Sequence, residues 1–542
     1  MSKRFDSFVR DRMPEAHSQP DLLKVPGRAY SPRLNVVEEL LDYWIARGYG
    51  ARPALMSPST KWTYDELFVR VSRYAAVLRH RLGVIPGNRV LLRGRNSPML
   101  AALHLAVIRA GGVVVSTMPL LRKNELVTII NKAEISHAIC EGDLLGELET
   151  CRSKCRSLRS ITSYRVYSGP VELGSADIDA FAATETRFAD AYRSRSDTPC
   201  LIAFTSGTTG KPKGAIHTHR DLLAICDTFS EHILQPTSDD LFCGSPSLAF
   251  TYGLGGLLLF PLRAGACSLL LEDGRPASLL QAIETYRPSI CFTAPTAYRA
   301  MLKSINDFDI RSLRKCVSAG EALPRATFEE FLLVTGLKLI DGIGSTEMLH
   351  VFISAAGDAI RPGSTGKVVP GYLATILDDQ GNEVPSGDVG WLAVKGPTGC
   401  RYLSDDRQNV YVKNGWNITG DAYSRDDDGY FWFQSRMDDL IVTSGYKVAA
   451  PEVESALLEH PAVAECAVVG VPCLDRGHSV KAYIILRTGM KKTNRLSETL
   501  IDHVKTVIAP YKAPREVVFV KGLPKTLTGK LKRFALRAQH AA

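Results

Sequence analysis

The sequence predicts a two-domain α/β protein, with a large N-terminal domain of helix-covered β-sheets and a small α+β C-terminal domain. The 542 residues exceed what one hydrophobic core usually organises, and 45% of them are apolar. Apolar β-branched runs alternate with helical stretches through most of the chain, a pattern typical of parallel sheets covered by helices. Near residue 430 this texture changes.

The clearest βαβ unit lies at residues 89–115. Residues 89–92 predict a strand, residues 97–109 a helix and residues 111–115 the next strand. The run at residues 248–271 is apolar enough to suggest a membrane span, but Pro261, Arg263 and several glycines interrupt it. We therefore expect a buried helix and strand there.

The second domain is predicted from the change near residue 430. An acidic turn at residues 426–429 leads into aromatic residues, and we place the boundary so that the domains are 1–437 and 438–542. A helix is expected to begin at Pro451, with Glu452 in its first turn, and strands are expected at residues 464–471 and 481–486.

Composition indicates a globular protein. The net charge of +9 suits anionic ligands or simply a solvated basic surface, and without a long basic run it requires no nucleic acid partner. Cysteines are scattered singly, and Cys151 and Cys155 lack companions at zinc spacing, so reduced core thiols are expected. The N-terminus lacks the apolar run of a signal peptide, which predicts a cytoplasmic protein without a membrane partner. The oligomeric state is left open, with a homodimer among the options.

Residues 204–214, FTSGTTGKPKG, are the most informative stretch of the chain. Glycines let backbone N–H groups approach phosphate oxygens, hydroxyls donate further hydrogen bonds, and Lys211 and Lys213 offset negative charge. The spacing differs from a Walker loop, because Pro212 follows Lys211 where that motif has Ser or Thr. The stretch predicts a polyphosphate-binding loop, with ATP as the ligand.

This loop resembles the phosphate loop of the adenylate-forming (ANL) superfamily, which includes acyl- and aryl-CoA ligases, adenylation domains and luciferases. The resemblance continues in order through DGIGSTE at residues 341–347, TGD at 419–421, SRMDD at 435–439 and PKTLTGK at 524–530. It implies the ANL fold with a mobile C-terminal domain, and ATP, Mg²⁺ and CoA as cofactor and co-substrates. The nucleotide-binding residues expected from it are Thr205, Ser206, Gly207, Thr208, Thr209, Gly210, Lys211, Gly320, Glu321, Asp341, Gly342, Ile343, Gly344, Ser345, Thr346, Asp421, Arg436 and Lys530.

Four residues of these motifs carry specific roles by resemblance. Glu347 is the expected metal residue and, with Thr346, a catalytic residue, because a carboxylate beside hydroxyls suits Mg²⁺. Asp421 is expected to accept hydrogen bonds from both ribose hydroxyls. Arg436 is expected to contact the nucleotide.

The resemblance also implies a domain rotation. Lys530 is the expected catalytic lysine, which bridges the carboxylate and phosphate during adenylation and then leaves the site. Asp438 stands at the hinge position. Rotation would bring in the CoA-binding residues Ser444, Gly445, Tyr446 and Lys447, where the glycine lets the pantetheine arm pass closely.

The acid is predicted from residues that resemble those of benzoate and 2-aminobenzoate CoA ligases. Aromatic and small side chains together favour a flat slot for a planar ring. Thr251 offers a hydroxyl to a ring amine, although a Thr bonded to backbone is commoner. The expected substrate-binding residues are Phe250, Thr251, Tyr252, Gly253, Ala319, Gly320, Gly344 and His350.

The sequence thus predicts an ATP-dependent aryl acid CoA ligase that acts on 2-aminobenzoate or benzoate through an acyl-AMP intermediate. Fatty or cinnamic-type acids remain alternatives, as does a stand-alone adenylation enzyme that loads a carrier protein, although no carrier domain follows Lys530. A luciferase-like oxygenase and an inactive binding protein are rivals of other classes. Intact Glu347, Asp421 and Lys530 disfavour the inactive copy.

Overall fold

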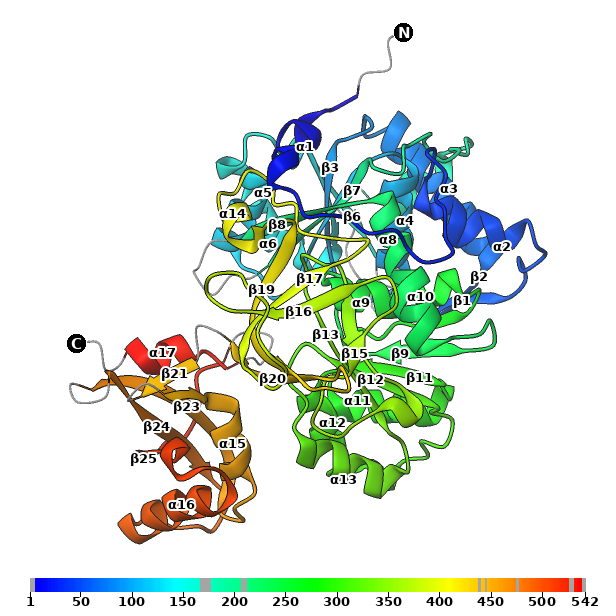
Figure 1. Ribbon diagram of the computed structural model, residues 1–542. Coiled ribbons are helices and arrows are strands. Elements are labelled where there is room, and N and C mark those ends of the chain that lie inside the picture. Colours follow the sequence, from blue (N-terminus) through cyan, green and yellow to red (C-terminus); the bar gives the residue numbers. More distant parts are fainter. Residues whose placement is uncertain are drawn as a thin grey trace.

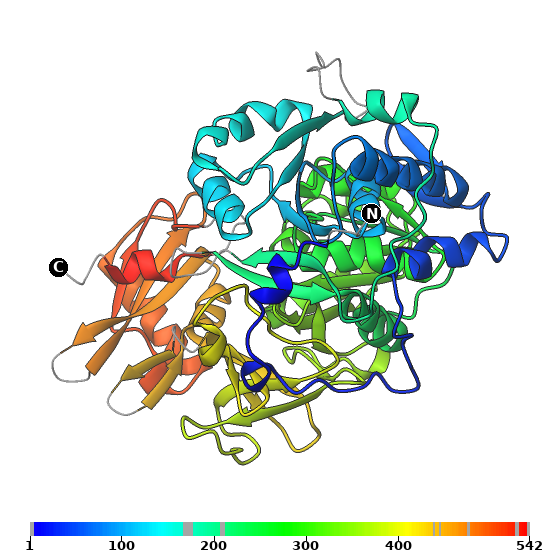
Figure 2. The ribbon, with the colours of Figure 1, turned by 90° about the horizontal axis from the view of Figure 1, so that it is seen from above.

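The computed structural model describes residues 5–165, 177–205, 212–436, 440–443, 446–473, 477–525 and 531–538. In these residues the strands form four sheets, three in the body of the molecule and one in a separate C-terminal lobe (Figures 1 and 2).

The first sheet has the order β6-β5-β3-β4-β7-β8 and is parallel except for the final β7–β8 hairpin. It contains the βαβ unit expected at residues 89–115, which is confirmed as β3, α4 and β4. The elements of this part of the chain are α1 (Phe8–Asp11), α2 (Tyr43–Ile45), α3 (Tyr64–His80), β3 (Arg89–Arg93), α4 (Pro98–Arg109), β4 (Val113–Thr117), α5 (Lys123–Lys132), β5 (His137–Glu141), α6 (Leu145–Glu149), β6 (Ser160–Tyr164), α7 (Ile178–Thr184), β7 (Pro199–Thr205), β8 (Lys213–Thr218) and α8 (His219–Ile225).

The second sheet has the order β15-β14-β13-β12-β11-β9-β10-β1-β2, with a parallel centre and antiparallel edges. The apolar run at 248–271 folds, as expected, into buried helices and a strand of this sheet. Its elements are β1 (Pro53–Ser57), β2 (Thr60–Thr63), β9 (Leu241–Gly244), α9 (Thr251–Leu254), α10 (Phe260–Arg263), β10 (Cys267–Leu269), α11 (Pro276–Tyr286), β11 (Ile290–Thr293), α12 (Pro295–Met301), β12 (Lys315–Ala319), α13 (Arg325–Thr335), β13 (Leu339–Gly344), β14 (Val351–Ser354) and β15 (Lys367–Val368).

Helix α4 lies at the centre of the body, because it contacts β3 and β4 of the first sheet and β1 of the second. All of its residues are buried, as expected for a helix that is apolar around its whole circumference. The Ser97 hydroxyl accepts a hydrogen bond from the Leu100 N–H at 3.2 Å, and Pro98 occupies the first turn. The same local signals therefore start the helix that joins the two sheets into one core.

The third sheet is antiparallel and carries the expected ribose-binding aspartate. Its order is β16-β17-β19-β18, and β20 pairs with β19, so the acidic turn near residue 430 joins two strands of this one sheet. The elements are β16 (Leu373–Leu377), β17 (Gly390–Lys395), α14 (Gln408–Tyr411), β18 (Val412–Lys413), β19 (Trp416–Arg425) and β20 (Phe431–Arg436).

The C-terminal lobe has its own sheet of order β22-β21-β24-β23, with β25 parallel to β24, and its own apolar core. Its helix α15 contacts β20 of the body. The elements are β21 (Leu440–Thr443), β22 (Tyr446–Ala449), α15 (Ala450–Leu458), β23 (Val463–Cys473), β24 (Gly477–Leu486), α16 (Asn494–Val507), β25 (Glu516–Phe519) and α17 (Arg533–Ala538). The predicted helix at Pro451 and both predicted strands are confirmed. The boundary at 437/438 falls outside the described residues.

Two further expectations can be compared with the structure. All twelve cysteines carry free thiols, and ten of them are buried, which confirms the expected core thiols. In the described part of the chain, every helix is too short or too polar to span a bilayer.

Candidate active site

The predicted phosphate loop is the connection between β7 and β8. These strands form an antiparallel hairpin whose last pair is Thr205 with Lys213, so both flanks of the loop are held at one end of the first sheet. The Thr205 hydroxyl is buried and has no hydrogen-bond partner among the described residues, which exclude the adjoining 206–211. The predicted residues Ser206, Gly207, Thr208, Thr209, Gly210 and Lys211 lie outside the described residues.

Glu347 lies beside this hairpin, in the turn after β13. Its side chain is buried, and its Oε1 accepts a hydrogen bond from the Tyr402 hydroxyl. The Lys213 ammonium is 3.7 Å from the same Oε1 and lies over the Tyr402 ring, 4.8 Å from the centroid. Burial, followed by the Glu347 charge, raises the pKa of Tyr402, so its phenol remains a donor. The turn thus places a carboxylate next to the predicted phosphate site.

The segment that carries Tyr402 is attached to β8 by backbone hydrogen bonds. The Ile216 N–H donates to the Arg401 carbonyl at 2.8 Å, and the Leu403 N–H donates to the Gly214 carbonyl at 2.9 Å. The buried Arg401 guanidinium pairs with the buried Asp221 carboxylate at 3.2 Å. Burial alone would raise the pKa of Asp221, but the Arg401 charge, His217 and the Thr218 N–H lower it below its usual value.

Three more contacts hold the turn that contains Glu347. The Ser345 hydroxyl is 3.1 Å from the Tyr411 hydroxyl and accepts from the Met348 N–H at 3.1 Å. His217 Nε2 donates to the Thr346 carbonyl at 2.8 Å, and burial lowers the pKa of His217 to about 4, so the ring is neutral at pH 7. The predicted residues 345–347 are therefore fixed by side chains of β8 and α14.

Asp421 and Arg436 face each other on the antiparallel pair β19 and β20. The Arg436 Nη1 donates to Asp421 Oδ1 at 2.8 Å, and the Asp421 N–H donates to the Thr419 hydroxyl at 3.2 Å. Gly420 between them has φ +79°, and a Cβ there would lie 3.0 Å from Arg436 Nη2. The Thr-Gly-Asp turn therefore brings a carboxylate and a guanidinium together; the nucleotide roles predicted for both residues stay predictions.

Asp341 lies at the end of the second sheet, where β12 and β13 pair Ala319 with Gly342. Burial raises the pKa of Asp341 to about 8, more than the Gly342 N–H and the nearby Ser318 hydroxyl lower it. In the part of the chain that the structure describes, its Oδ1 has no hydrogen-bond partner. A perturbed carboxyl of this kind marks a candidate functional position. Gly320 and Glu321 follow directly in the loop after β12.

An aromatic cluster lies behind these strand ends. His350 packs against Tyr252, Phe229 and Phe260, with ring centroids 5.7, 5.4 and 4.6 Å away. Burial lowers the pKa of His350 to about 3, more than the backbone of Tyr252 raises it, and among the described residues no side chain hydrogen-bonds either ring nitrogen. A Cβ on Gly255 would lie 2.4 Å from His350 Cδ2, so glycine is needed for this packing.

The structure therefore brings several of the predicted acid-binding residues together. Tyr252 and His350 are in contact, and a Cβ on Gly344 would lie 2.5 Å from the His350 carbonyl oxygen. The Tyr252 hydroxyl donates to the Val317 carbonyl at 3.1 Å, next to Ala319 on β12. Phe250, Thr251 and Gly253 lie on the same short segment as Tyr252, at the start of α9.

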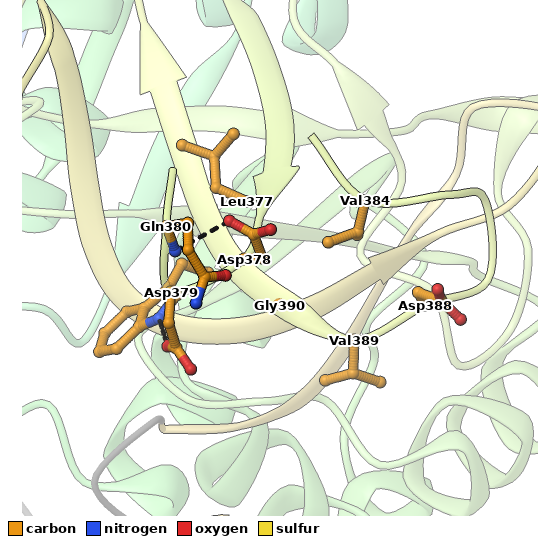
Figure 3. Close-up of a pocket in the computed structure, with 9 residues that line it drawn as sticks. Leu377, Asp378, Asp379, Gln380, Val384, Asp388, Val389 and Gly390 are labelled. Carbon is orange, nitrogen blue, oxygen red and sulfur yellow. Dashed lines mark hydrogen bonds between the residues drawn. The ribbon is translucent and has the colours of Figure 1, made fainter. Parts of the chain in front are cut away.

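A separate hollow of about 410 Å³ lies at the hairpin of β16 and β17 (Figure 3). Its lining includes Asp378, Asp379, Asp388 and Trp391, and the Trp391 indole N–H donates to Asp379 at 2.8 Å. None of the predicted site residues lines it.

The remaining predicted residues belong to the C-terminal lobe. Asp438, Ser444, Gly445 and Lys530 lie outside the described residues, and for Tyr446 and Lys447 only the backbone, in β22, is described.

Tyr402, Arg401 and Asp221 were not predicted as site residues. The only local signal among them is Thr218 followed three residues later by Asp221, a capping-box spacing at the start of α8.

Comparison with known proteins was made in sequence and in structure. A family model described as AMP-binding enzyme matches residues 43–402, and one described as AMP-binding enzyme C-terminal domain matches residues 452–530. The benzoate–CoA ligase of Thauera aromatica is 34% identical over 526 residues, which cover 96% of this chain and 98% of that protein. The mitochondrial acyl-coenzyme A synthetase ACSM4 of Mus musculus is 33% identical over 560 residues, with 98% and 95% covered.

Two solved structures share the fold. The anthranilate CoA ligase AuaEII in complex with anthranoyl-AMP superposes with a TM-score of 0.88 at 32% identity, covering 94% of this chain and 98% of that one. A benzoate CoA ligase from Burkholderia xenovorans LB400 gives a TM-score of 0.83 at 32% identity, covering 93% and 100%.

Proposed function

The chain belongs to the AMP-binding enzyme family as an AMP-forming acyl- or aryl-CoA ligase of the ANL superfamily, and from this premise we propose that its acid substrate is aromatic, with 2-aminobenzoate preferred over benzoate. ATP and CoA are the co-substrates of such ligases. The products are the aryl-CoA thioester, AMP and pyrophosphate.

The observation that carries the proposal is the buried His350 within the aromatic cluster. Aromatic side chains around one position suit the faces and edges of a planar ring. The relatives described as benzoate–CoA ligase and anthranilate CoA ligase support the same class of acid.

The preference for an amino-substituted ring follows from hydrogen bonding. A buried acceptor nitrogen without a hydrogen-bond partner costs about 1–3 kcal/mol. Neutral His350 has one acceptor nitrogen, which the amine of 2-aminobenzoate would satisfy while its second N–H bonds the adjacent carboxylate. Benzoate and fatty acids have no donor to offer at that position.

The proposed chemistry proceeds in two half-reactions. A carboxylate oxygen of the acid attacks the α-phosphorus of ATP, the bond to the pyrophosphate oxygen breaks, and acyl-AMP forms. The CoA thiolate then attacks the acyl carbonyl and AMP leaves. Lys530 and the loop at 204–214 stabilise the phosphate charge of the first half-reaction, and Asp421 holds the ribose.

The surroundings of Glu347 fit a Mg²⁺ ion that arrives with ATP. Its carboxylate is an oxygen ligand of the kind the ion prefers, and it lies next to the predicted phosphate loop. When bound, the ion would neutralise phosphate charge. The chain's own contribution is to hold this carboxylate in place.

The proposed rotation of the C-terminal lobe separates the half-reactions. The lobe has its own core, and the chain reaches it from β20 through residues 437–439, where Asp438 is the proposed hinge. Rotation would exchange Lys530 for residues 444–447 at the site. The proposed domains are accordingly 1–437 and 438–542.

A fatty acid is the second candidate, because the mitochondrial acyl-coenzyme A synthetase is about as similar in sequence as the benzoate–CoA ligase. A screen of AMP release separates the two. The panel comprises benzoate, 2-aminobenzoate, hydroxybenzoates, cinnamates, and medium and long fatty acids, each with and without CoA. We expect 2-aminobenzoate to give the highest kcat/KM, and medium or long fatty acids exceeding every aryl acid would contradict the proposal.

His350→Phe is the matched variant, because it keeps an aromatic ring and removes both nitrogens. The ratio of kcat/KM for 2-aminobenzoate over benzoate should fall about 10-fold, the effect of one buried hydrogen bond. An unchanged ratio would show that His350 does not accept a hydrogen bond from the amine of the substrate.

A further inference from the structure

We propose that Tyr402 is a positioning residue that holds Glu347 by one carboxylate oxygen and thereby turns the other oxygen toward the nucleotide's Mg²⁺. The inference rests on the proposed function, because it concerns the metal of the ATP half-reaction. It assigns a role to a residue far from the phosphate loop in sequence.

The two oxygens of the Glu347 carboxylate have different surroundings. Both recorded contacts of its oxygens, the hydrogen bond from the Tyr402 hydroxyl and the approach of the Lys213 ammonium at 3.7 Å, fall on Oε1. Within the described part of the chain, Oε2 has no recorded partner. Glu347 is only 6% exposed, so most of the side chain lies within the protein. An ionised carboxylate accepts at both oxygens, and here one of them is available.

Tyr402 is fixed before any ligand arrives. Its N–H donates to the Gln408 side chain at 2.8 Å, and the Gln408 amide is held in turn by the Cys400 carbonyl at 3.0 Å. Its ring packs edge-on against Tyr411 at 5.9 Å, and the residue pairs with Ala215 of β8. Because its backbone and ring are both held, its hydroxyl defines where Oε1 lies.

Lys213 has a different role at the same carboxylate. Lys213 is the first residue of β8, where the predicted phosphate loop ends. Its long side chain approaches Glu347 Oε1 and the Tyr402 ring. An ammonium on a flexible stem can shift toward a phosphate when one is present. The Tyr402 hydroxyl then remains as the fixed contact that orients Glu347.

Tyr402→Phe tests this role, because it removes one hydroxyl and keeps the ring. Two quantities are measured for each variant: the Kd of ATP by calorimetry, with Mg²⁺ and with EDTA, and the Mg²⁺ concentration for half-maximal acyl-AMP formation. We expect the half-saturating Mg²⁺ concentration to rise about 10-fold, the scale of a hydrogen bond to a charged group. Added Mg²⁺ should restore kcat, and the Kd of ATP in EDTA should not change.

Tyr64→Phe is the control for loss of a buried hydroxyl. Tyr64 is the first residue of α3, and its hydroxyl donates to the Ala266 carbonyl at 2.8 Å. This variant should leave the Mg²⁺ dependence unchanged. Glu347→Gln sets the upper limit of the effect. Since the ratio of ATP affinity with and without Mg²⁺ is read within each variant, a lower melting temperature does not produce the expected pattern.

The outcomes are distinct. An unchanged Mg²⁺ half-saturation in Tyr402→Phe, or a loss of activity that added Mg²⁺ does not restore, would overturn the positioning role. A wild-type protein that forms no acyl-AMP from any carboxylic acid would instead overturn the proposed function. A Mg²⁺-specific defect in Tyr402→Phe that is absent from Tyr64→Phe supports the inference.

Discussion

Replacing Asp221 with Asn should destabilise the body of the protein strongly, because it breaks a fully buried ion pair without changing side-chain volume. Asp221 is 0% exposed and Arg401 is 3% exposed, and their charged atoms are 3.2 Å apart. Asn keeps an oxygen for the Thr218 N–H, so the start of α8 retains its cap. The change therefore isolates the charge.

Two estimates of the magnitude agree. Coulomb's law at that separation and an effective dielectric constant of about 20 gives about 5 kcal/mol. Removal of one partner from a buried pair typically costs about 3–5 kcal/mol, because the other charge is left without compensation. We therefore expect the free energy of unfolding to fall by about 3–5 kcal/mol.

Guanidinium unfolding followed by tryptophan fluorescence measures this change. All five tryptophans precede residue 437, so the signal reports on the body and not on the C-terminal lobe. The pH dependence is a second readout. Because the folded pKa of Asp221 is lowered, its stabilisation is present above the unfolded pKa of about 3.9 and is lost as pH falls through the folded value. The difference between wild type and Asp221→Asn should be constant from about pH 5 to 8 and narrow in stronger acid.

The double variant Asp221→Leu with Arg401→Met removes both charges and provides the control. It should lose less stability than Asp221→Asn, since apolar side chains can replace a buried pair at little cost. A loss below about 1 kcal/mol in Asp221→Asn, or a double variant less stable than the single one, would refute the reasoning.

Three further predictions concern the reaction. Lys530→Ala should slow adenylation by about 100- to 1000-fold and spare thioester formation from pre-made acyl-AMP; equal damage to both half-reactions would contradict alternation. Asp421→Asn should raise the KM for ATP about 10-fold or more, because a charged acceptor of the ribose is lost, and a matching rise in the KM of the acid would disagree. Asp438→Pro should keep adenylation and abolish CoA transfer, with Gly445→Leu giving the same accumulation of bound acyl-AMP; thioester formation at the wild-type rate would show that residue 438 is not the pivot.

The fold was predictable where local sequence carries the signal. The strand–helix–strand unit around α4 follows from short β-branched runs, a serine cap and Pro98, all readable within residues 89–117. The strands at residues 464–471 and 481–486 of the C-terminal lobe were predictable for the same reason. The roles assigned by resemblance depend on short motifs that follow the family's order along the chain. These roles could therefore also be proposed from the sequence.

The contacts that organise the site were not predictable. Tyr402 and Glu347 are separated by 55 positions in the chain, and Arg401 and Asp221 by 180. Such pairs are set by how β8 packs beside the segment at 400–403, and neither periodicity nor propensity encodes that packing. Two of the aromatic neighbours of His350 were missed for the same reason, since Phe229 and Phe260 come from separate helical segments.

The pairing of Arg436 with Asp421 links the proposed ribose site to the chain segment that leads to the C-terminal lobe. Arg436 is the final residue of β20. The guanidinium that hydrogen-bonds the proposed ribose-binding carboxylate therefore lies at the end of the last strand of the third sheet. Only one residue separates it from the proposed pivot at 438. A ribose bound by Asp421 would therefore compete with Arg436 for the same carboxylate, two residues before the proposed hinge. This arrangement would couple nucleotide binding at Asp421 to the orientation of the C-terminal lobe.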